Sequence, residues 1–176
     1  MLFRPPLDPK ELNKDPNTGQ PYVKVVKGED VDMLSYVPFT GITIGRDPTN
    51  PVRLNDNSSS RVHCRVAYEG HNFVLLDNGS TNGTFCNGER VQRAALGFGD
   101  IIRVGDSDLL FSCQGYDLKD QDAVHAISVF EDCLEREPDY IAALRMLAFL
   151  LERDVARKRE AQPLWDRIRD LEKSGG

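Results

Sequence analysis

The sequence of 176 residues lacks the motifs of the common enzyme sites. It contains no Gly-x-x-x-x-Gly-Lys-Ser/Thr phosphate-binding loop, no HExxH zinc-binding pair and no Gly-x-Ser-x-Gly nucleophile turn. Its three histidines, His63, His71 and His125, have no ligand-like spacing, and no serine, cysteine and acid constellation surrounds His63. These absences predict a protein that is not an enzyme and that needs no metal or other cofactor.

Cysteine is scarce and scattered. The four cysteines, Cys64, Cys86, Cys113 and Cys133, form no CxxC pair and stand among apolar or strand-like residues. A zinc site needs more closely spaced ligands than these. We therefore expect free thiols that act as small apolar residues in a reducing compartment.

Long hydrophobic runs are also missing. No segment approaches the ~20 consecutive apolar residues of a membrane span. The start, residues 1–6, has no apolar core of signal-peptide length. We therefore expect a cytoplasmic protein that does not interact with a membrane.

Positive charge is in the minority, since 22 lysines and arginines face 28 aspartates and glutamates, for a net charge of -6. This balance argues against nucleic acid as a partner, because binding a phosphate backbone requires clustered Lys and Arg. Hydrophobic residues make up 40% and charged residues 28% of the chain. These values are those of an ordinary globular protein, which can still hold a local basic pocket.

Short strand-like segments fill the region from residue 21 to residue 115. Turn signals recur there about every 8 to 12 residues, which is typical of a β-sandwich or barrel. Asn87-Gly88 favours a tight hairpin turn, because both residues tolerate positive φ. The β-branched and aromatic runs predict strands at residues 22–26, 33–37, 42–44, 52–54, 62–66, 72–76, 84–86, 101–104 and 109–111.

The two ends of the chain differ from this central region. Residues 1–20 contain four prolines and no periodicity, which predicts an extended N-terminal lead-in. After Gly115 the apolar residues take helical spacing, which predicts three helices within residues 116–176. We expect the first to end at Pro138, the second to cover about residues 140–152 and the third about residues 161–171, with Trp165 largely buried.

Part of the helical segment is similar to a tetratricopeptide repeat, in which the second helix of one repeat precedes the first helix of the next. Cys133 stands where that repeat usually has alanine, and only about one and a half repeats are present, below the roughly three of a free-standing solenoid. A repeat fragment and a generic three-helix appendage therefore remain as alternatives, and either one offers a surface for a further protein partner. The matching positions are Ala126, Phe130, Cys133, Pro138, Leu144, Leu147, Ala148 and Leu151.

Three motifs stand out where predicted strands give way to loops: Gly45-Arg46, Ser60-Arg61-Val62-His63 and the run from Asp77 to Thr84. They hold two arginines, several hydroxyls and an asparagine, and Asp77 is their one acid. Arginine offers a planar fork of donors that matches phosphate oxygens, and hydroxyl groups add directional donors. The motifs therefore predict a phosphate-binding site.

The order of these motifs, Gly-Arg, then Ser-Arg-x-His, then Ser-Thr-Asn-Gly-Thr followed by Asn-Gly, resembles a forkhead-associated (FHA) domain over about residues 22–112. The resemblance implies an eleven-stranded antiparallel β-sandwich that binds phosphothreonine peptides through loops at one end, without catalysis. The expected fold class is therefore mainly β, with an FHA-like sandwich at residues 21–115 and a three-helix segment at residues 116–176.

The first two motifs are expected to supply the contacts to the phosphate. Arg46 follows a β-branched strand and is expected at the rim, where it makes the main phosphate contact. Ser60 ends a polar tract, so its hydroxyl can donate to a phosphate oxygen. By resemblance, Arg61 lies beside the phosphothreonine, although an ion pair with Glu69 or Asp77 on the surface is the alternative.

The third motif supplies the remaining contacts. Thr81 offers a second hydroxyl or backbone donor, and Asn82 can hydrogen-bond the main chain of an extended peptide. Gly45 and Gly83 are assigned to support of the loops, and Gly83 permits an unusual φ value there. By resemblance, His63 turns inward and braces the loops through a hydrogen bond to a backbone group.

Two functions compete on this basis. The first is a module that reads phosphothreonine in a partner protein in phosphorylation-dependent signalling. The second is a phosphate-independent scaffold or oligomerisation module, as in some FHA-type proteins of secretion apparatus. The presence of Arg46, Ser60, Thr81 and Asn82 together favours the first, because a scaffold needs none of them.

Overall fold

A computed structural model describes residues 17–116 and 123–175. Within this part the chain divides into two compact units, one of residues 20–112 and one that joins residues 17–19 to the segment from Cys113 onward. Most of the predicted N-terminal lead-in, residues 1–16, lies outside the described residues.

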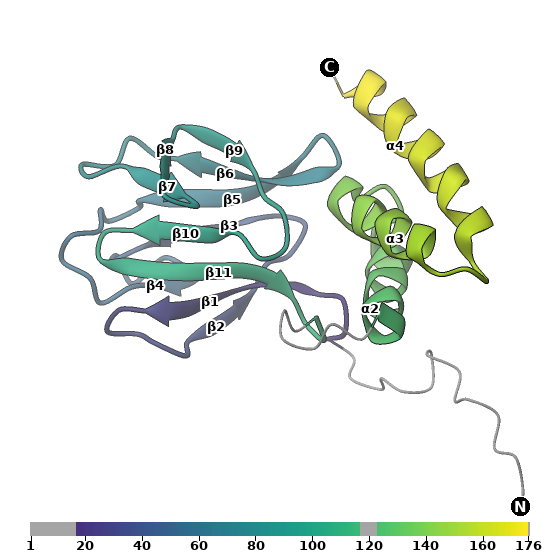
Figure 1. The fold of residues 1–176 in the computed structure, drawn as a ribbon. Helices are drawn as coiled ribbons and strands as arrows, with labels where there is room; N and C mark the ends of the chain where they lie inside the picture. The colour runs from purple at the N-terminus through teal and green to yellow at the C-terminus, as the bar shows by residue number, and fades with distance from the viewer. Residues whose placement is uncertain (1–16, 117–122, 176) are drawn as a thin grey trace, which may run out of the picture. The chain divides into compact units, whose positions relative to one another are not determined.

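The first unit is a β-sandwich whose eleven strands in the described residues form two sheets (Figure 1). The six-stranded sheet has the order β2-β1-β11-β10-β7-β8, and the five-stranded sheet the order β4-β3-β5-β6-β9. The predicted fold class is therefore confirmed. The strands are β1 (Pro21–Lys27), β2 (Leu34–Tyr36), β3 (Ile42–Gly45), β4 (Val52–Arg53), β5 (Cys64–Glu69), β6 (Asn72–Asp77), β7 (Thr84–Cys86), β8 (Glu89–Val91), β9 (Arg93–Ala95), β10 (Ile101–Val104) and β11 (Ser107–Cys113).

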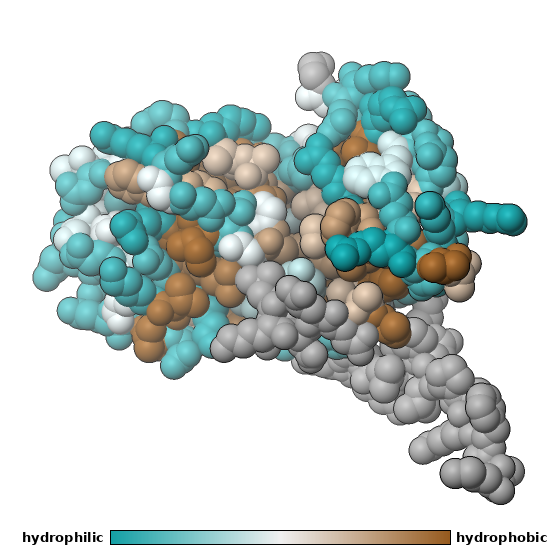
Figure 2. Space-filling view, in the orientation of Figure 1, coloured by the Kyte–Doolittle hydropathy of each residue, from teal (hydrophilic) through white to brown (hydrophobic). Residues whose placement is uncertain are grey.

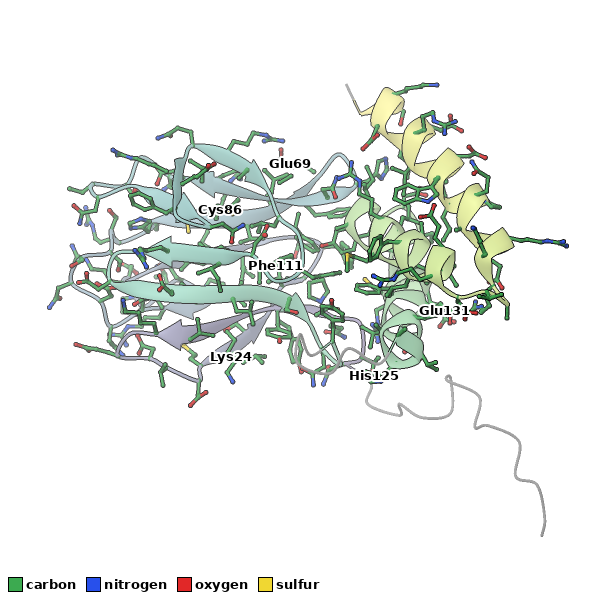
Figure 3. The ribbon with its side chains drawn as sticks, viewed as in Figure 1. Lys24, Glu69, Cys86, Phe111, His125 and Glu131 are labelled. Carbon is green, nitrogen blue, oxygen red and sulfur yellow. The ribbon has the colours of Figure 1, made fainter. Side chains whose placement is uncertain are left out.

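Alternating residues of the strands form the core between the sheets. In β1, Val23 and Val25 are buried while Lys24 between them is partly exposed, as the two-residue period of a strand requires. Phe73 of β6 and Phe111 of β11 come from opposite sheets, and their ring centroids lie 5.7 Å apart (Figure 3). This contact joins the two sheets across the core.

The hairpin prediction at Asn87-Gly88 is confirmed, since β7 pairs antiparallel with β8 and the two turn residues have φ values of 51° and 85°. Strands β8 and β9 themselves were not among the predicted segments. Both are three residues long and lie at the edges of their sheets. Their residues are largely exposed, so they lack the alternating apolar pattern that marks a strand in a sequence.

The second unit contains three α-helices: α2 (Ala123–Arg136), α3 (Ile141–Arg153) and α4 (Ala161–Ser174), with a short 3₁₀ helix, η1 (Lys158–Glu160), before the last. Pro138 follows α2 as predicted. Ile141, Leu144 and Ile168 form a buried cluster between α3 and α4. Outside it, Glu131 of α2 accepts a hydrogen bond from Arg157 at 2.7 Å (Figure 3).

Trp165 is only half-buried, which corrects the prediction that it would be largely buried. Its ring packs beside the cluster of Ile141, Leu144 and Ile168, while its indole N–H donates to Glu152 at 2.7 Å. An indole that finds its hydrogen-bond partner at the surface has no need of a buried one. The position is therefore compatible with a stable unit although the ring keeps contact with solvent.

All four cysteines are free and buried, as predicted. Burial raises the pKa of the Cys133 thiol to about 12 and raises the pKa of Cys64 and Cys113 as well. Such thiols are poor nucleophiles, because the reactive species is the thiolate. Among residues 17–116 and 123–175, no helix is long and apolar enough to cross a membrane.

Candidate functional site

The three sequence motifs meet at one end of the sandwich. Strands β3 and β6 both run antiparallel to β5, so the end of β3, the start of β5 and the end of β6 lie together, at the left in Figure 1. The turn between β10 and β11 reaches the same loops, because the backbone N–H of Asp106 donates to Asp56 at 2.8 Å. Four connections of the sandwich thus form a single surface.

Arg46 is placed by an unusually close approach of two backbone segments. The backbone N–H of Arg46 donates to the carbonyl of Ser60, and that of Asp47 donates to the carbonyl of Arg61, both at 3.1 Å. A Cβ atom at Gly45 would lie 2.2 Å from the carbonyl oxygen of Arg61, so this approach requires glycine. The exposed Arg46 side chain then reaches back, and its Nε donates to the carbonyl of Ser59 at 3.0 Å. Among the described residues, its terminal nitrogens make no hydrogen bond, so they remain available as donors for a ligand.

Ser60 and Thr81 connect the loop before β5 to the loop after β6. The backbone N–H of Thr81 donates to Oγ of Ser60 at 3.1 Å. The Ser60 hydroxyl acts as the acceptor in this contact, so its own hydrogen remains available to a ligand. The backbone N–H of Thr81 is occupied in this arrangement, whereas its exposed hydroxyl has no partner among residues 17–116 and 123–175.

His63 lies fully buried beneath these loops. Its Nδ1 accepts a hydrogen bond from the backbone N–H of Ser60 at 3.0 Å, and its Nε2 lies 2.9 Å from the carbonyl of Gly83. An acceptor at Nδ1 requires the neutral tautomer with the hydrogen on Nε2, which then donates to Gly83. Gly83 itself has a φ of 86°, a value that favours glycine. His63 thus spans the two loops without reaching the surface.

Asp77 holds the third motif in shape. Its carboxylate accepts the backbone N–H and hydroxyl of Ser80 and the hydroxyl of Thr84. Burial opposes ionisation here, but the hydrogen bonds from Ser80 and Thr84 outweigh it, so the pKa of Asp77 is lowered. Asn82, farther along the loop, donates to the carbonyl of Ser58 at 2.8 Å. The carboxylate of Asp77, the one acid of the three motifs, is therefore engaged in hydrogen bonds within its own loop.

These loops enclose a hollow of about 370 Å³, which we call the phosphate hollow. It brings together all five residues predicted to contact a phosphopeptide, and no carboxylate is among its lining residues. Guanidinium, hydroxyl and amide groups on its wall are all able to donate hydrogen bonds to an anion. The lining residues are Arg46, Asn57, Ser58, Ser59, Ser60, Arg61, Thr81 and Asn82.

The surface ion pairs considered as an alternative for Arg61 are absent from the described part of the chain. Glu69 forms ion pairs with Arg65 and Arg93, and Asp77 is occupied within its own loop. Arg61 is exposed and, in the described part of the chain, makes no ion pair with either acid. Arg61 lines the phosphate hollow, and its contact with a phosphothreonine stays a prediction.

Three residues that position the site were not recognised in the sequence. Asn50 is buried and its amide donates to the carbonyls of Asp47 and Arg61 at 2.9 and 2.7 Å. Asp56, also buried, accepts hydrogen bonds from Ser107 and from two backbone N–H groups. Ser59 supplies the carbonyl that holds Arg46. Each lies in a polar stretch that looks like an ordinary turn, and no local signal distinguishes these residues from their neighbours.

Comparison with known proteins agrees with the sequence resemblance. The FHA domain family model matches residues 42–105. The chain is 40% identical over 94 residues to the glycogen accumulation regulator GarA of Mycolicibacterium smegmatis, an alignment that covers 53% of this chain and 60% of GarA. The chain thus spans less than two thirds of the length of this curated relative.

Two solved structures share the fold of the sandwich. The FHA domain of an Arabidopsis thaliana hypothetical protein is 26% identical, with a TM-score of 0.52, and the match covers 60% of this chain and 96% of that domain. A domain from an analysis of phosphothreonine-dependent FHA domain interactions is 29% identical, with a TM-score of 0.50, and the match covers 55% of this chain and 99% of that domain.

The family match ends at residue 105 and does not reach the helices. The tetratricopeptide resemblance of the helical unit receives no support from these comparisons and stays a prediction. The relative GarA is named as a regulator of glycogen accumulation. Residues 42–105 are thus similar to an FHA domain, and they contain all the loops that form the phosphate hollow.

Proposed function

We propose that the sandwich binds phosphothreonine peptides in the phosphate hollow, without catalysis, and that it acts in phosphorylation-dependent protein-protein interaction. One observation carries the proposal: Arg46, Ser60, Arg61, Thr81 and Asn82 come from three separate loops and line one hollow that has no carboxylate in its wall. Such a wall attracts a phosphate dianion and provides no general base or nucleophile pair for a reaction.

Each lining group has a role in this proposal. Arg46, held by the Ser59 carbonyl, makes the main phosphate contact with its terminal nitrogens. The Ser60 hydroxyl donates to a second phosphate oxygen while it still accepts the N–H of Thr81. Asn82 presents its amide to the peptide main chain and thereby fixes the register of the peptide. Arg61 adds charge at the edge.

The cellular setting is part of the same proposal. The four free, buried cysteines support a reducing, cytoplasmic location, because thiols stay reduced there. GarA is named as a regulator of glycogen accumulation. By analogy, this chain is proposed to act as a regulator that binds a phosphorylated partner protein. The helical unit, whether a tetratricopeptide fragment or a generic appendage, is proposed to contact a further protein partner.

Calorimetry with an oriented phosphothreonine peptide library tests the proposal. We expect some members to bind and their unphosphorylated counterparts to show no binding, because the phosphate supplies about -1.5 to -2 charges at neutral pH. Binding should weaken as the pH falls through about 6, where the phosphate takes up its second proton. If phosphorylated and unphosphorylated libraries bind alike, the proposal is wrong.

One observation favours the second candidate, a phosphate-independent scaffold. Four large hydrophobic side chains are exposed on or between the edge strand β2 and its neighbour β1, namely Val26, Val31, Leu34 and Tyr36. Hydrophobic surface is visible over this edge in Figure 2. Exposed apolar patches often mark protein contacts. Self-association that is lost in Leu34→Lys and insensitive to phosphopeptide would favour this function over the first.

A further inference from the structure

A second hollow adjoins the phosphate hollow. It has a volume of about 420 Å³, and Ser60 and Arg61 line both hollows. Its remaining wall consists of Asp47, Thr49, Val62 and Asn78, and we call it the Asp47 hollow. A peptide that places its phosphate on one side of Ser60 and Arg61 therefore extends into, or past, this second space.

The carboxylate of Asp47 gives the Asp47 hollow its character. The backbone N–H and hydroxyl of Thr49 both donate to Oδ1 of Asp47, at 3.0 and 2.7 Å. These bonds, and then the nearby charges of Arg61 and Arg46, lower the pKa of Asp47, so the group is ionised at neutral pH. Among the described residues, Oδ2 of Asp47 has no hydrogen bond. It is available to a donor that enters the hollow.

The wall between the two hollows is held in place independently of any ligand. The buried Asn50 amide donates to the carbonyls of both Asp47 and Arg61, and the backbone N–H of Asp47 donates to the same Arg61 carbonyl. Asn78 is likewise tied back, through a hydrogen bond from its amide to the carbonyl of Val62. Because these bonds fix the backbone at Asp47, its carboxylate has a defined position before any ligand binds.

Charge decides which side chain suits this position. When a phosphate dianion binds, it neutralises Arg46 and Arg61, the two cations that otherwise balance Asp47. Asp47 then remains as an uncompensated negative charge beside the peptide. A basic side chain restores the balance and an acidic side chain is repelled. The partly buried Val62 offers an apolar contact for the stem of a long basic side chain.

We propose that Asp47 determines sequence specificity by receiving a lysine or arginine side chain of the bound peptide, on one side of the phosphothreonine. This inference rests on the proposed function of the phosphate hollow. An extended peptide advances about 3.3 Å per residue, and the hollows share a wall, so the basic residue lies within about three positions of the phosphothreonine. The ligand class is thus a basic-flanked phosphothreonine peptide.

The test uses fluorescence anisotropy with the full chain and phosphothreonine peptides on an alanine background. Lysine or glutamate is placed singly at each of the three positions before and after the phosphothreonine. We expect lysine to be preferred over glutamate by about three- to tenfold at one or two neighbouring positions on one side, as for a partly exposed ion pair plus the matching repulsion. In Asp47→Asn this preference should fall to within about twofold.

Asp47→Asn is chosen because asparagine keeps the acceptor for Thr49 and removes only the charge. Glu89→Gln makes the same change of net charge on an exposed strand residue outside both hollows, and it should leave the preference unchanged. An Asp47→Asn protein that binds phosphopeptides with the preference of the wild type overturns the inference while the proposed function stands. Equal changes at all six positions also overturn it, since they indicate a long-range effect of charge. If no peptide binds the wild type, the proposed function itself has failed.

Discussion

In Arg46→Ala, binding of a phosphothreonine peptide should weaken at least about tenfold, while the fold stays intact. Arg46 is exposed, and within the described part of the chain its side chain makes one hydrogen bond, to the carbonyl of Ser59, so its loss removes little from the sandwich itself. Loss of one partner of a desolvated, charged contact typically costs about 2 to 5 kcal/mol, and about 1.4 kcal/mol corresponds to a factor of ten. Because Arg46 sits at an open rim, we expect the low end of this range.

Two variants make the Arg46 experiment specific. Arg53→Ala removes an exposed arginine of β4 that lines neither hollow, and it should leave calorimetric affinity within about twofold. Arg46→Lys keeps the charge but loses the planar fork and the bond from Nε, so its affinity should lie between those of Arg46→Ala and the wild type. If Arg53→Ala weakens binding as much as Arg46→Ala, net charge and not the hollow governs the affinity.

His63→Ala should destabilise the sandwich by about 3 to 5 kcal/mol, the largest effect on stability that we expect from a residue near the site. The substitution leaves a cavity where a fully buried ring stood. It also removes the partners of the Ser60 N–H and the Gly83 carbonyl, and each buried polar group without a partner costs about 1 to 3 kcal/mol. The two loops that His63 joins should then lose their defined positions.

Hydrogen exchange of the β5 and β6 amides measures this loss in the sandwich. Fluorescence does not, because the single tryptophan, Trp165, belongs to the helical unit. His71→Asn is the matched control, since His71 lies in a turn with a φ of 66°, a value that asparagine tolerates well. We expect little change in that variant. Equal protection in His63→Ala and the wild type would contradict the role assigned to His63.

The sequence was sufficient to predict the fold class and the residues that gather at the phosphate hollow. Strands such as β6 and β10 contain runs of apolar residues, which indicate a strand from the sequence alone. The short edge strands β8 and β9 lack such runs, because their exposed residues become strands through pairing with a neighbour and not through burial. Trp165 was misjudged for a related reason, since its burial depends on how α3 and α4 pack and on the position of Glu152.

The polar residues that hold the loops were beyond sequence reasoning. Asp56 is buried while Asn55 and Asn57 on either side are exposed, and this choice follows from the approach of the turn between β10 and β11, 50 residues away. Asn50 is buried because the backbone at Gly45 passes close to Arg61. In the sequence, Asp47 is only the residue after Arg46 and belongs to none of the three motifs. Its place in a second hollow becomes visible only once the two loops are brought together.

The central claim is that a phosphothreonine peptide binds at the three loops that form the phosphate hollow. Titration of the isotope-labelled protein with a bound member of the peptide library, followed through the backbone amide resonances, tests it residue by residue. We predict the largest shifts at Ser60, Arg61, Thr81 and Asn82, with saturation that requires the phosphate. Shifts confined to the exposed edge of β1 and β2, or equal shifts with the unphosphorylated peptide, would contradict the claim.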